Sequence, residues 1–384
     1  MRTITFLQPN RLTIGFGCVA ECISYVQGLN RPAVHIISSP SLWTTMTEIG
    51  SSLIGSGCIV SIDAGINAEP TISMFEQAVA KARDAKAACV LGIGGGSVLD
   101  IAKLVAAFVD SDQNVEETFG IDLLRSRHCH LVCMPTTAGT GSEVSPNAIL
   151  LDEQAKLKKG VISPYLVPDA TFIDPHMTLS MPPAVTASTG LDALTHCIEA
   201  YTNKFAHPLV DVYALQGISL CHQFLARAVR QPDDLEAREG MSLASLYGGL
   251  CLGPVNTAAV HALAYPLGGE FHVPHGLSNA LLLSHVFRFN AQATPDRHAA
   301  VAIAMGVRPS ADALDTAYLG ADRLKQLATD CGVLTDLSRY KVDLSAIPGM
   351  AKSAMTVTRL LKNNPRDIDE AACLKIYSEC FQEQ

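Results

Sequence analysis

The sequence lacks any uninterrupted apolar run near the ~20 residues that a membrane-spanning helix needs. Its first residues, Met1–Phe6, are interrupted by polar side chains and do not resemble the long apolar segment of an export signal. Positive charge is also scarce, since 28 Lys and Arg stand against 37 Asp and Glu for a net charge of −9. This balance disfavours a reader of nucleic-acid phosphates or a polybasic membrane binder. We therefore expect a soluble protein with neither nucleic acid nor membrane as a partner.

The twelve cysteines form no CxxC pair and show no spacing of a disulfide framework. Most have apolar neighbours, where a free cysteine behaves as a small hydrophobic residue. This usage predicts reduced thiols and a cytoplasmic protein. With 48% hydrophobic and 17% charged residues, the 384-residue chain has the composition of an ordinary globular protein. At ~150 residues per domain, its length predicts two or three domains.

Short apolar runs alternate with helix-like segments in the first third of the chain. Strands are predicted at residues 33–37, 58–62, 88–93 and 130–134. Helices are predicted between them at 71–85 and 97–110. Alternation at this spacing predicts a parallel sheet covered by helices.

The pattern changes near residue 180, after which long amphipathic or wholly apolar stretches replace the alternation. Helices are predicted at residues 187–202, 208–229, 238–252, 256–265 and 312–331. Such a series indicates an all-α domain. The predicted organisation is an α/β domain over residues 1–180 and a helical domain over residues 181–384.

Two loops rich in small residues follow predicted strands. In Gly92–Asp100, glycines between a strand and a helix let the backbone approach a diphosphate, and the helix N-terminus supplies N–H donors. The loop is not a GxGxxG fingerprint, because Ser97 stands at the last glycine position. In Pro135–Glu143, hydroxyls follow the carboxyl end of a strand, where open α/β sheets bind ligands. Each loop alone also fits a turn without a ligand, but the two together favour a nucleotide site.

Four further residues have the chemistry of a metal site. Asp192 and His196 lie four residues apart in an apolar helical stretch, hence on one helix face, and burying them without a partner would cost on the order of several kcal/mol. His261 lies in another predicted helix, and His275 follows Pro266–Gly269, a sequence expected to break that helix. One carboxylate and three imidazoles suit Fe²⁺, Zn²⁺ or Mn²⁺, and the lack of cysteine ligands disfavours a closed structural zinc site. Each histidine alone also fits an ordinary helix or loop residue.

Together these segments resemble the iron-containing (group III) alcohol dehydrogenase family. The hallmarks are GGGSxxDxAK at Gly94–Lys103, PTTAGTGSE at Pro135–Glu143 and DALTHxIEAY at Asp192–Tyr201, and agreement continues at Asp169–Pro175 and Asn363–Arg366. The resemblance thus runs nearly end to end. It implies a Rossmann-like dinucleotide-binding α/β domain, an all-α C-terminal domain, and an active site in the cleft between them. It also implies a homo-oligomer, dimeric or larger.

The resemblance assigns roles to individual residues of this chain. The implied metal ligands are Asp192, His196, His261 and His275. The implied cofactor contacts are Gly95, Gly96, Ser97, Thr136, Thr137, Thr140 and Lys158, and we expect Gly94 and Asp100 of the first motif at the same site.

Two positions depart from the family pattern. Many members have a histidine near the nicotinamide where this chain has Tyr265, whose hydroxyl can donate a hydrogen bond but, with a pKa near 10, accepts a proton poorly at neutral pH. We therefore expect Tyr265 or His272 to take part in proton transfer. NAD-preferring members often have an aspartate where this chain has Ser39. Its loss removes the repulsion of a 2′-phosphate, so both NAD and NADP are candidate cofactors.

We interpret the sequence as that of a metal-dependent, NAD(P)-linked alcohol dehydrogenase or aldehyde reductase. Such an enzyme passes a hydride between nicotinamide and a small alcohol or aldehyde, with Fe²⁺, or else Zn²⁺ or Mn²⁺, as Lewis acid. Rivals within the superfamily are a glycerol dehydrogenase and a maleylacetate reductase, the latter disfavoured by the intact Asp192. A non-redox metallohydrolase and a catalytically silent nucleotide-binding protein are alternatives from other classes.

Overall fold

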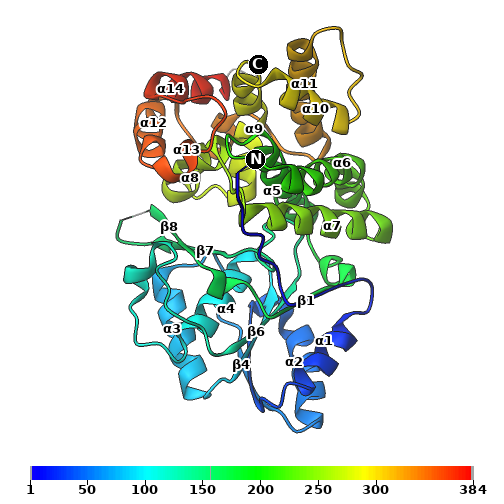
Figure 1. Cartoon of the computed structure of the whole chain (residues 1–384), viewed down its shortest axis with the longest axis vertical. Coiled ribbons are helices and arrows are strands. Elements are labelled where there is room, and N and C mark those ends of the chain that lie inside the picture. Colours follow the sequence, from blue (N-terminus) through cyan, green and yellow to red (C-terminus); the bar gives the residue numbers. More distant parts are fainter. Residues whose placement is uncertain (1, 156, 382–384) are drawn as a thin grey trace. The chain divides into compact units, whose positions relative to one another are not determined.

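Parallel strands and a series of helices occupy separate parts of the chain (Figure 1). The computed structural model describes residues 2–155 and 157–381. The α/β unit comprises Phe6–Thr137 and Gly141–Leu179, and the helical unit comprises Met1–Thr5, Ala138–Thr140 and Ser180–Gln384. The expected succession of a helix-covered parallel sheet and a helical part is therefore confirmed.

Six parallel strands form the main sheet of the α/β unit, in the order β1-β9-β6-β4-β2-β3. They are β1 (Arg11–Ile14), β2 (Ala33–Ser38), β3 (Ile59–Asp63), β4 (Cys89–Gly94), β6 (His130–Pro135) and β9 (Ala170–Ile173). The four strands predicted from apolar runs are confirmed as β2, β3, β4 and β6. The other two were missed because a four-residue strand is too short to show a periodic pattern.

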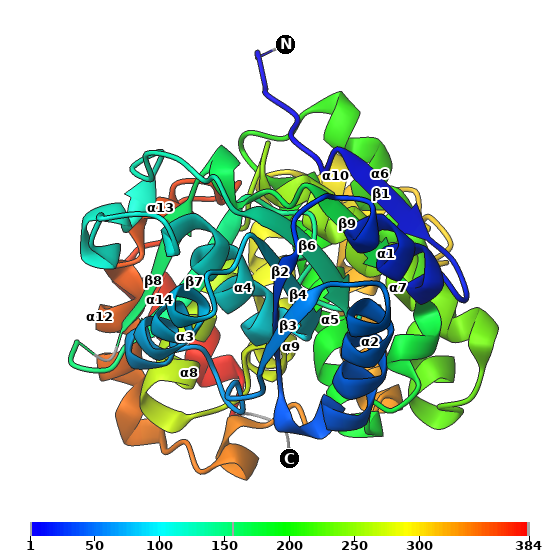
Figure 2. The same ribbon diagram turned by 90° about the horizontal axis from the view of Figure 1, so that it is seen from below.

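Helices cover both faces of this sheet (Figure 2). On one face α1 (Val19–Gln27) and α2 (Trp43–Gly55) pack on side chains such as Ile36. On the other, α3 (Ile72–Asp84) and α4 (Gly96–Phe108) pack on side chains such as Ile37. Because neighbouring residues of one strand are buried on opposite faces, these strands appear in the sequence as continuous apolar runs.

A smaller sheet, in the order β5-β8-β7, completes the α/β unit. It consists of β5 (Gly120–Ile121), β7 (Asn147–Asp152) and β8 (Leu157–Ile162), with β7 and β8 antiparallel. These strands were not predicted, because β8 contains two lysines and a glycine and shows no apolar run. Single 3₁₀ turns occur at Pro40–Leu42, Val115–Thr118, Pro164–Leu166, Pro175–Thr178, Leu337–Tyr340 and Leu344–Ala346.

The helical unit is built around a 20-residue helix, α5 (Pro183–Thr202), which packs against α6, α7 and α9. The remaining helices are α6 (Pro208–Arg230), α7 (Leu235–Leu252), α8 (Ala259–Phe271), α9 (His275–Ala291), α10 (Pro295–Ala304), α11 (Ala313–Asp330), α12 (Ile347–Met355), α13 (Thr358–Leu361) and α14 (Glu370–Glu379). The predicted helices are confirmed as α5, α6, α7, α8 and α11, with shifted ends. Residues 190–202 of α5 are all buried, so the polar side chains among them, such as Asp192, His196 and Glu199, need partners inside the helical unit.

The expectation that Pro266–Gly269 breaks the helix before His275 is wrong. These residues lie inside α8, which continues to Phe271. Proline and glycine weaken an isolated helix, but most of α8 is buried, and tertiary packing supplies the stability that local propensity lacks. The helix ends at His272, whose φ of 55° is left-handed.

Two expectations from composition can be compared with the described residues. No helix among them is both long enough and apolar enough to cross a membrane. All twelve cysteines are free thiols, and eleven of them are buried. They therefore fill the core as small hydrophobic side chains.

Candidate active site

The main sheet brings three expected cofactor segments to one edge. Strands β2, β4 and β6 are adjacent and parallel, so their carboxyl ends lie next to one another. Ser39 follows β2, Gly95–Ser97 follow β4, and Thr136 and Thr137 follow β6. The chain passes from β2 to β3 on one side and then returns to β4 on the other side of β2. Such a switch point is where open α/β sheets bind dinucleotides.

Close packing of β4 against α4 explains the glycines between them. A Cβ on Gly94 would lie 2.6 Å from the Cβ of Val98, which is closer than real Cβ contacts come. Gly95 precedes α4 as a cap without a side-chain hydrogen bond, and a Cβ on it would lie 3.1 Å from the methyl group of Thr137. Gly95 and the half-buried Gly96 therefore leave the start of α4 without side chains, so a diphosphate could approach the backbone N–H groups there.

Asp100 and Lys103 of the first motif are both engaged within the α/β unit. Asp100 Oδ1 accepts a hydrogen bond from the Ser142 hydroxyl at 2.5 Å, and its Oδ2 accepts one from a backbone N–H of β7. The fully buried Lys103 donates to the carbonyl oxygens of Ser142 and Ser145, at 2.9 and 3.1 Å, and to that of Asn147. Burial lowers the pKa of Lys103, although the Asp100 carboxylate opposes the shift. These bonds fasten the loop after β6 to α4.

The other expected cofactor residues lie in three places. The half-buried Ser39 forms a hydroxyl–hydroxyl hydrogen bond of 2.8 Å with Ser41. Lys158 lies on β8, where its buried side chain pairs with Glu69. Thr140 groups with the helical unit and not with the sheet.

Three of the four expected metal ligands, Asp192, His261 and His275, form one group in the helical unit, and His196 lies next to Asp192 and His261. The distances from Asp192 Oδ1 to the three Nε2 atoms are 3.8 Å for His196, 3.6 Å for His261 and 3.7 Å for His275. The Nε2 atoms of His196 and His261 are 3.1 Å apart. Around a tetrahedral ion with bonds of ~2.1 Å, ligand atoms lie about 3.4 Å from one another. Asp192, His261 and His275, whose ligand atoms all lie within 4.8 Å of one another, are therefore close enough to share one divalent ion, and His196 is not part of that group.

Two glycines bring the supporting elements close enough. A Cβ on Gly276 of α9 would lie 2.3 Å from the carbonyl oxygen of Ser188 on α5, so only glycine permits this approach. A Cβ on Gly139 would lie 2.6 Å from the Cβ of Thr189, also on α5. The first contact places His275 beside α5, and the second places the Gly139 carbonyl 3.3 Å from Nδ1 of His196.

The hydrogen bonds at the two Nδ1 atoms show what the cluster needs. His261 Nδ1 lies 2.6 Å from Oε2 of Glu199, and a carboxylate oxygen can only accept. The carbonyl of Gly139 likewise only accepts, so both histidines donate from Nδ1. In their neutral forms both Nε2 atoms then carry lone pairs that face each other beside the Asp192 carboxylate. A cation among them removes this repulsion, so the donor set fits a divalent metal.

The pKa shifts point to the same requirement. Burial favours the neutral acid, but the imidazoles of His196, His275 and His261 hold the pKa of Asp192 well below its usual range. Burial lowers the pKa of His196. Burial also opposes a charge on His261, yet the Glu199 and Asp192 carboxylates outweigh it and raise the pKa of His261 to about 9. Positive charge is thus stabilised at this point, whether a proton or a metal ion supplies it.

The cluster is open on the His275 side. The side chains of Asp192, His196 and His261 are at most 6% exposed, whereas that of His275 is 30% exposed. The half-buried Tyr265 lies near it, with ring centroids 6.5 Å apart. His272 is exposed at the end of α8. Such an open side is typical of a catalytic metal site, not a closed structural one.

Sequence reasoning missed two polar residues that contact the ligands. Glu199 holds Nδ1 of His261, and Asn279 Nδ2 donates to Asp192 Oδ1 at 2.7 Å. Both are buried. Each lies one helical turn after a metal ligand, in an otherwise apolar stretch, and that spacing is the signal that could have revealed them.

Two family models together match nearly the whole chain. The model of the iron-containing alcohol dehydrogenases matches residues 9–175, and the C-terminal model of the Fe-containing alcohol dehydrogenase family matches residues 186–381. This chain belongs to the iron-containing alcohol dehydrogenase family. The resemblance inferred from the motifs is confirmed, and the protein is an oxidoreductase of the alcohol dehydrogenase type.

Individual members of the family are similar over almost their full length. Long-chain-alcohol dehydrogenase 1 of Geobacillus thermodenitrificans is 36% identical, covering 96% of this chain and 94% of the relative. A crystal structure of a 1,3-propanediol oxidoreductase is 31% identical, with a TM-score of 0.95 over 99% of this chain and 100% of the other. Sulfoacetaldehyde reductase from Bifidobacterium kashiwanohense, solved in complex with NAD⁺, is 26% identical, with a TM-score of 0.88 over all of both chains. The names show that one fold serves several alcohols and aldehydes.

Proposed function

We propose that this alcohol dehydrogenase holds a divalent metal ion, Fe²⁺ or in its place Zn²⁺ or Mn²⁺, with Asp192, His196, His261 and His275. The observation that carries the proposal is the group of Asp192, His261 and His275, whose ligand atoms lie within 4.8 Å of one another. Nε2 of His196 lies next to this group, 3.8 Å from Asp192 Oδ1 and 3.1 Å from Nε2 of His261. When bound, the ion supplies a Lewis acid for the oxygen of an alcohol or aldehyde. The single carboxylate leaves a net charge near +1 with a divalent ion, which favours an alkoxide.

The proton is proposed to move through the open side of the cluster. Tyr265 lies beside His275 and can donate a hydrogen bond to a substrate oxygen. His272 is exposed, so its imidazole can exchange protons with water. We therefore assign Tyr265 to hydrogen bonding and His272 to proton exchange.

The nicotinamide cofactor is proposed to bind at the carboxyl edge of the main sheet. The residues assigned to it are Ser39, Gly94, Gly95, Gly96, Ser97, Asp100, Thr136, Thr137, Thr140 and Lys158. The switch point of the sheet and the bare first turn of α4 support this assignment, as does the NAD⁺ complex of the sulfoacetaldehyde reductase. Because Ser39 carries no negative charge, the adenosine site accepts NADP as well as NAD. Residues 1–180 thus serve as the NAD(P)-binding domain and residues 181–384 as the metal-binding domain.

Substrate class, assembly and location complete the proposal. The substrate is a small alcohol or aldehyde, as the oxidoreductases among the relatives indicate. The enzyme is proposed to act as a cytoplasmic homo-oligomer, a dimer or larger.

The test is an activity screen of short aldehydes with NADH and NADPH in parallel, after reconstitution with Fe²⁺ or Zn²⁺. Chelation should abolish turnover while NAD(P)H still binds. His261→Ala should lose turnover and keep the cofactor affinity measured by nicotinamide fluorescence. Full activity after exhaustive chelation would exclude the metal-dependent reaction, and failure to bind NAD(P)H would favour a metallohydrolase.

A further inference from the structure

Glu199 connects two helices of the helical unit through both of its carboxylate oxygens. It lies on α5, its side chain is 4% exposed, and its Oε2 accepts from Nδ1 of His261 at 2.6 Å. Its Oε1 accepts from the backbone N–H of Val260 at 2.6 Å. The residue before α8, Ala258, offers no side-chain cap, so a carboxylate from another helix satisfies an N–H group in the first turn of α8. That turn carries His261.

Only a carboxylate can make both contacts. Val260 and His261 each present a hydrogen that needs an acceptor. A glutamine at position 199 has one carbonyl oxygen and one NH₂ group, so one of the two donors would face another donor. An aspartate keeps both acceptors on a side chain shorter by one methylene group.

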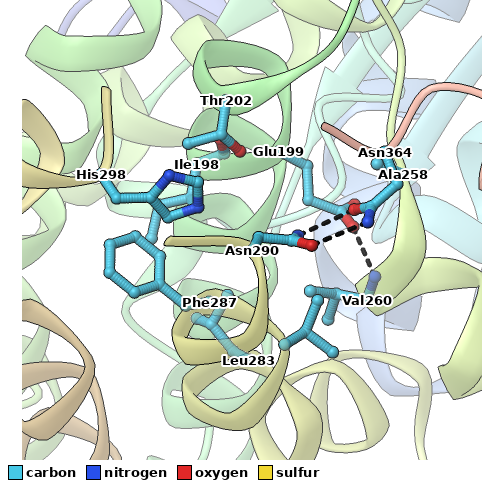
Figure 3. A pocket seen from close by; sticks show the side chains of 11 residues that line it. Ile198, Glu199, Thr202, Ala258, Val260, Leu283, Phe287, Asn290, His298 and Asn364 are labelled. Atoms are coloured by element: carbon cyan, nitrogen blue, oxygen red, sulfur yellow. Dashed lines mark hydrogen bonds between the residues drawn. The ribbon is translucent and has the colours of Figure 1, made fainter. Parts of the chain in front are cut away.

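A small cavity is lined by Glu199 and ten other residues (Figure 3). Its lining residues are all buried, and it has about 10 Å³ of space for the centre of a water molecule. That is roughly the volume needed by a single water molecule. The polar part of the lining consists of Glu199, Thr202, Asn290, His298 and Asn364.

His298 leaves one acceptor unmatched in this lining. Its Nδ1 lies 2.9 Å from the carbonyl oxygen of Thr294 and therefore donates to it. Burial lowers the pKa of His298 to about 4, so the ring is neutral and its Nε2 carries a lone pair. This buried Nε2 has no hydrogen-bond partner among the described residues. The neighbouring Asn290 and Asn364 bond each other at 2.8 and 2.7 Å.

We propose that Glu199 is a positioning residue that turns Nε2 of His261 toward the metal ion, and that one water molecule in the cavity donates to His298 and completes the polar surroundings of Glu199. A histidine that binds metal through one nitrogen commonly has its other nitrogen held by a carboxylate, which fixes both the tautomer and the ring orientation. Here the carboxylate is itself buried, so it needs polar neighbours of its own. The inference rests on the proposed metal site.

The first test measures Co²⁺ binding to the full-length protein, by chelator competition and by the visible absorption bands of the bound ion. Glu199→Gln should weaken Co²⁺ binding by about 10–100-fold and change the bands. Glu199→Asp should restore part of the affinity, and the exposed Glu236→Gln should bind as the wild type does. NADH affinity, measured by fluorescence, should stay unchanged in all three.

The outcomes separate this inference from the proposed function. Wild-type protein that does not bind Co²⁺ would refute the metal site itself. If the wild type binds Co²⁺ and Glu199→Gln binds it with the same affinity and the same visible spectrum, the role of Glu199 is refuted. If Glu199→Gln does not fold, Glu199→Asp decides, because a displaced carboxylate should still weaken binding and shift the bands.

The second test is a high-resolution crystal structure of the wild type and of His298→Phe. The wild type should show one water within hydrogen-bond distance of His298 Nε2, and His298→Phe should lack it. His298→Phe should also weaken Co²⁺ binding, by less than Glu199→Gln does. A dry cavity in the wild type would overturn the water site and leave the role of Glu199 to the first test.

Discussion

The two units build their candidate sites from different parts of the chain. In the α/β unit the site is mainly backbone, with glycines and hydroxyls at the ends of β2, β4 and β6. In the helical unit it consists of side chains, a carboxylate and imidazoles that are mostly buried and that hold one another in place. A backbone site depends on space and is sensitive to an added atom. A side-chain site depends on individual charged groups and is sensitive to a lost one.

The largest effect is expected from removing the carboxylate of the side-chain site. Asp192→Asn eliminates the negative charge among three imidazoles and one of the metal ligands. Substituting a residue that only hydrogen-bonds a metal ligand lowers metal affinity by up to ~100-fold. Loss of the ligand itself should lower metal affinity by more than that, and turnover should be lost as well. Metal content after dialysis and steady-state rates measure both effects, while NADH affinity should persist.

The matched control is Asp322→Asn, which removes an exposed carboxylate that pairs with Arg288. An exposed pair contributes roughly 0–1 kcal/mol, so this variant should keep its metal and its activity. Retained metal in Asp192→Asn would show that the four side chains do not share an ion.

The sequence predicted the backbone site of the α/β unit and the side-chain site of the helical unit to different extents. The buried strands and the loops after them were found because continuous apolar runs and glycines are local signals. The metal ligands were recognised through the motif around Asp192 and His196. Glu199 was missed, because its partners Val260 and His261 lie about sixty residues away, and its place one helical turn after His196 does not by itself reveal them. The continuation of α8 through Pro266 was missed for a related reason, since packing overrides local propensity there.

Adding one carbon atom to the backbone site is expected to have the next largest effect. In Gly94→Ala the new Cβ would meet three side-chain atoms of Val98 at 2.6–2.9 Å, so β4 and α4 must move apart. Overpacking of this kind costs about 1–3 kcal/mol, and the moved helix end should bind NADH more weakly. Thermal unfolding and fluorescence titration measure the two effects.

Gly55→Ala is the control within the same unit, because its Cβ would meet nothing within 4 Å. It should leave NADH affinity unchanged. Metal affinity should be normal in both variants. Unaltered NADH binding by a folded Gly94→Ala would argue against the proposed cofactor edge.

Two buried groups, Glu143 in the α/β unit and His298 in the helical unit, should contribute pH dependences of opposite sign to the stability. In the α/β unit, burial raises the pKa of Glu143 to about 7, although Lys103 opposes the shift. Between about pH 4.5 and 7 the folded state keeps a proton that the unfolded state has released, so stability falls as pH rises. Glu143→Gln should therefore raise the free energy of unfolding at pH 8 by about 2–3 kcal/mol and change it little at pH 4.5. The melting temperature measured at the two pH values checks this.

His298 in the helical unit should contribute the reverse dependence, with a slightly smaller effect. The pKa of His298 is lowered to about 4 by burial, so below the unfolded value near 6.5 the unfolded state takes up a proton that the folded state does not. The contribution of His298 to stability should fall by about 2 kcal/mol between pH 7.5 and 5. His298→Phe removes this contribution and should flatten the dependence of the melting temperature on pH, whereas the exposed His128→Gln should not. If both variants follow the wild-type curve, the neutral His298 on which the water site depends would be refuted as well.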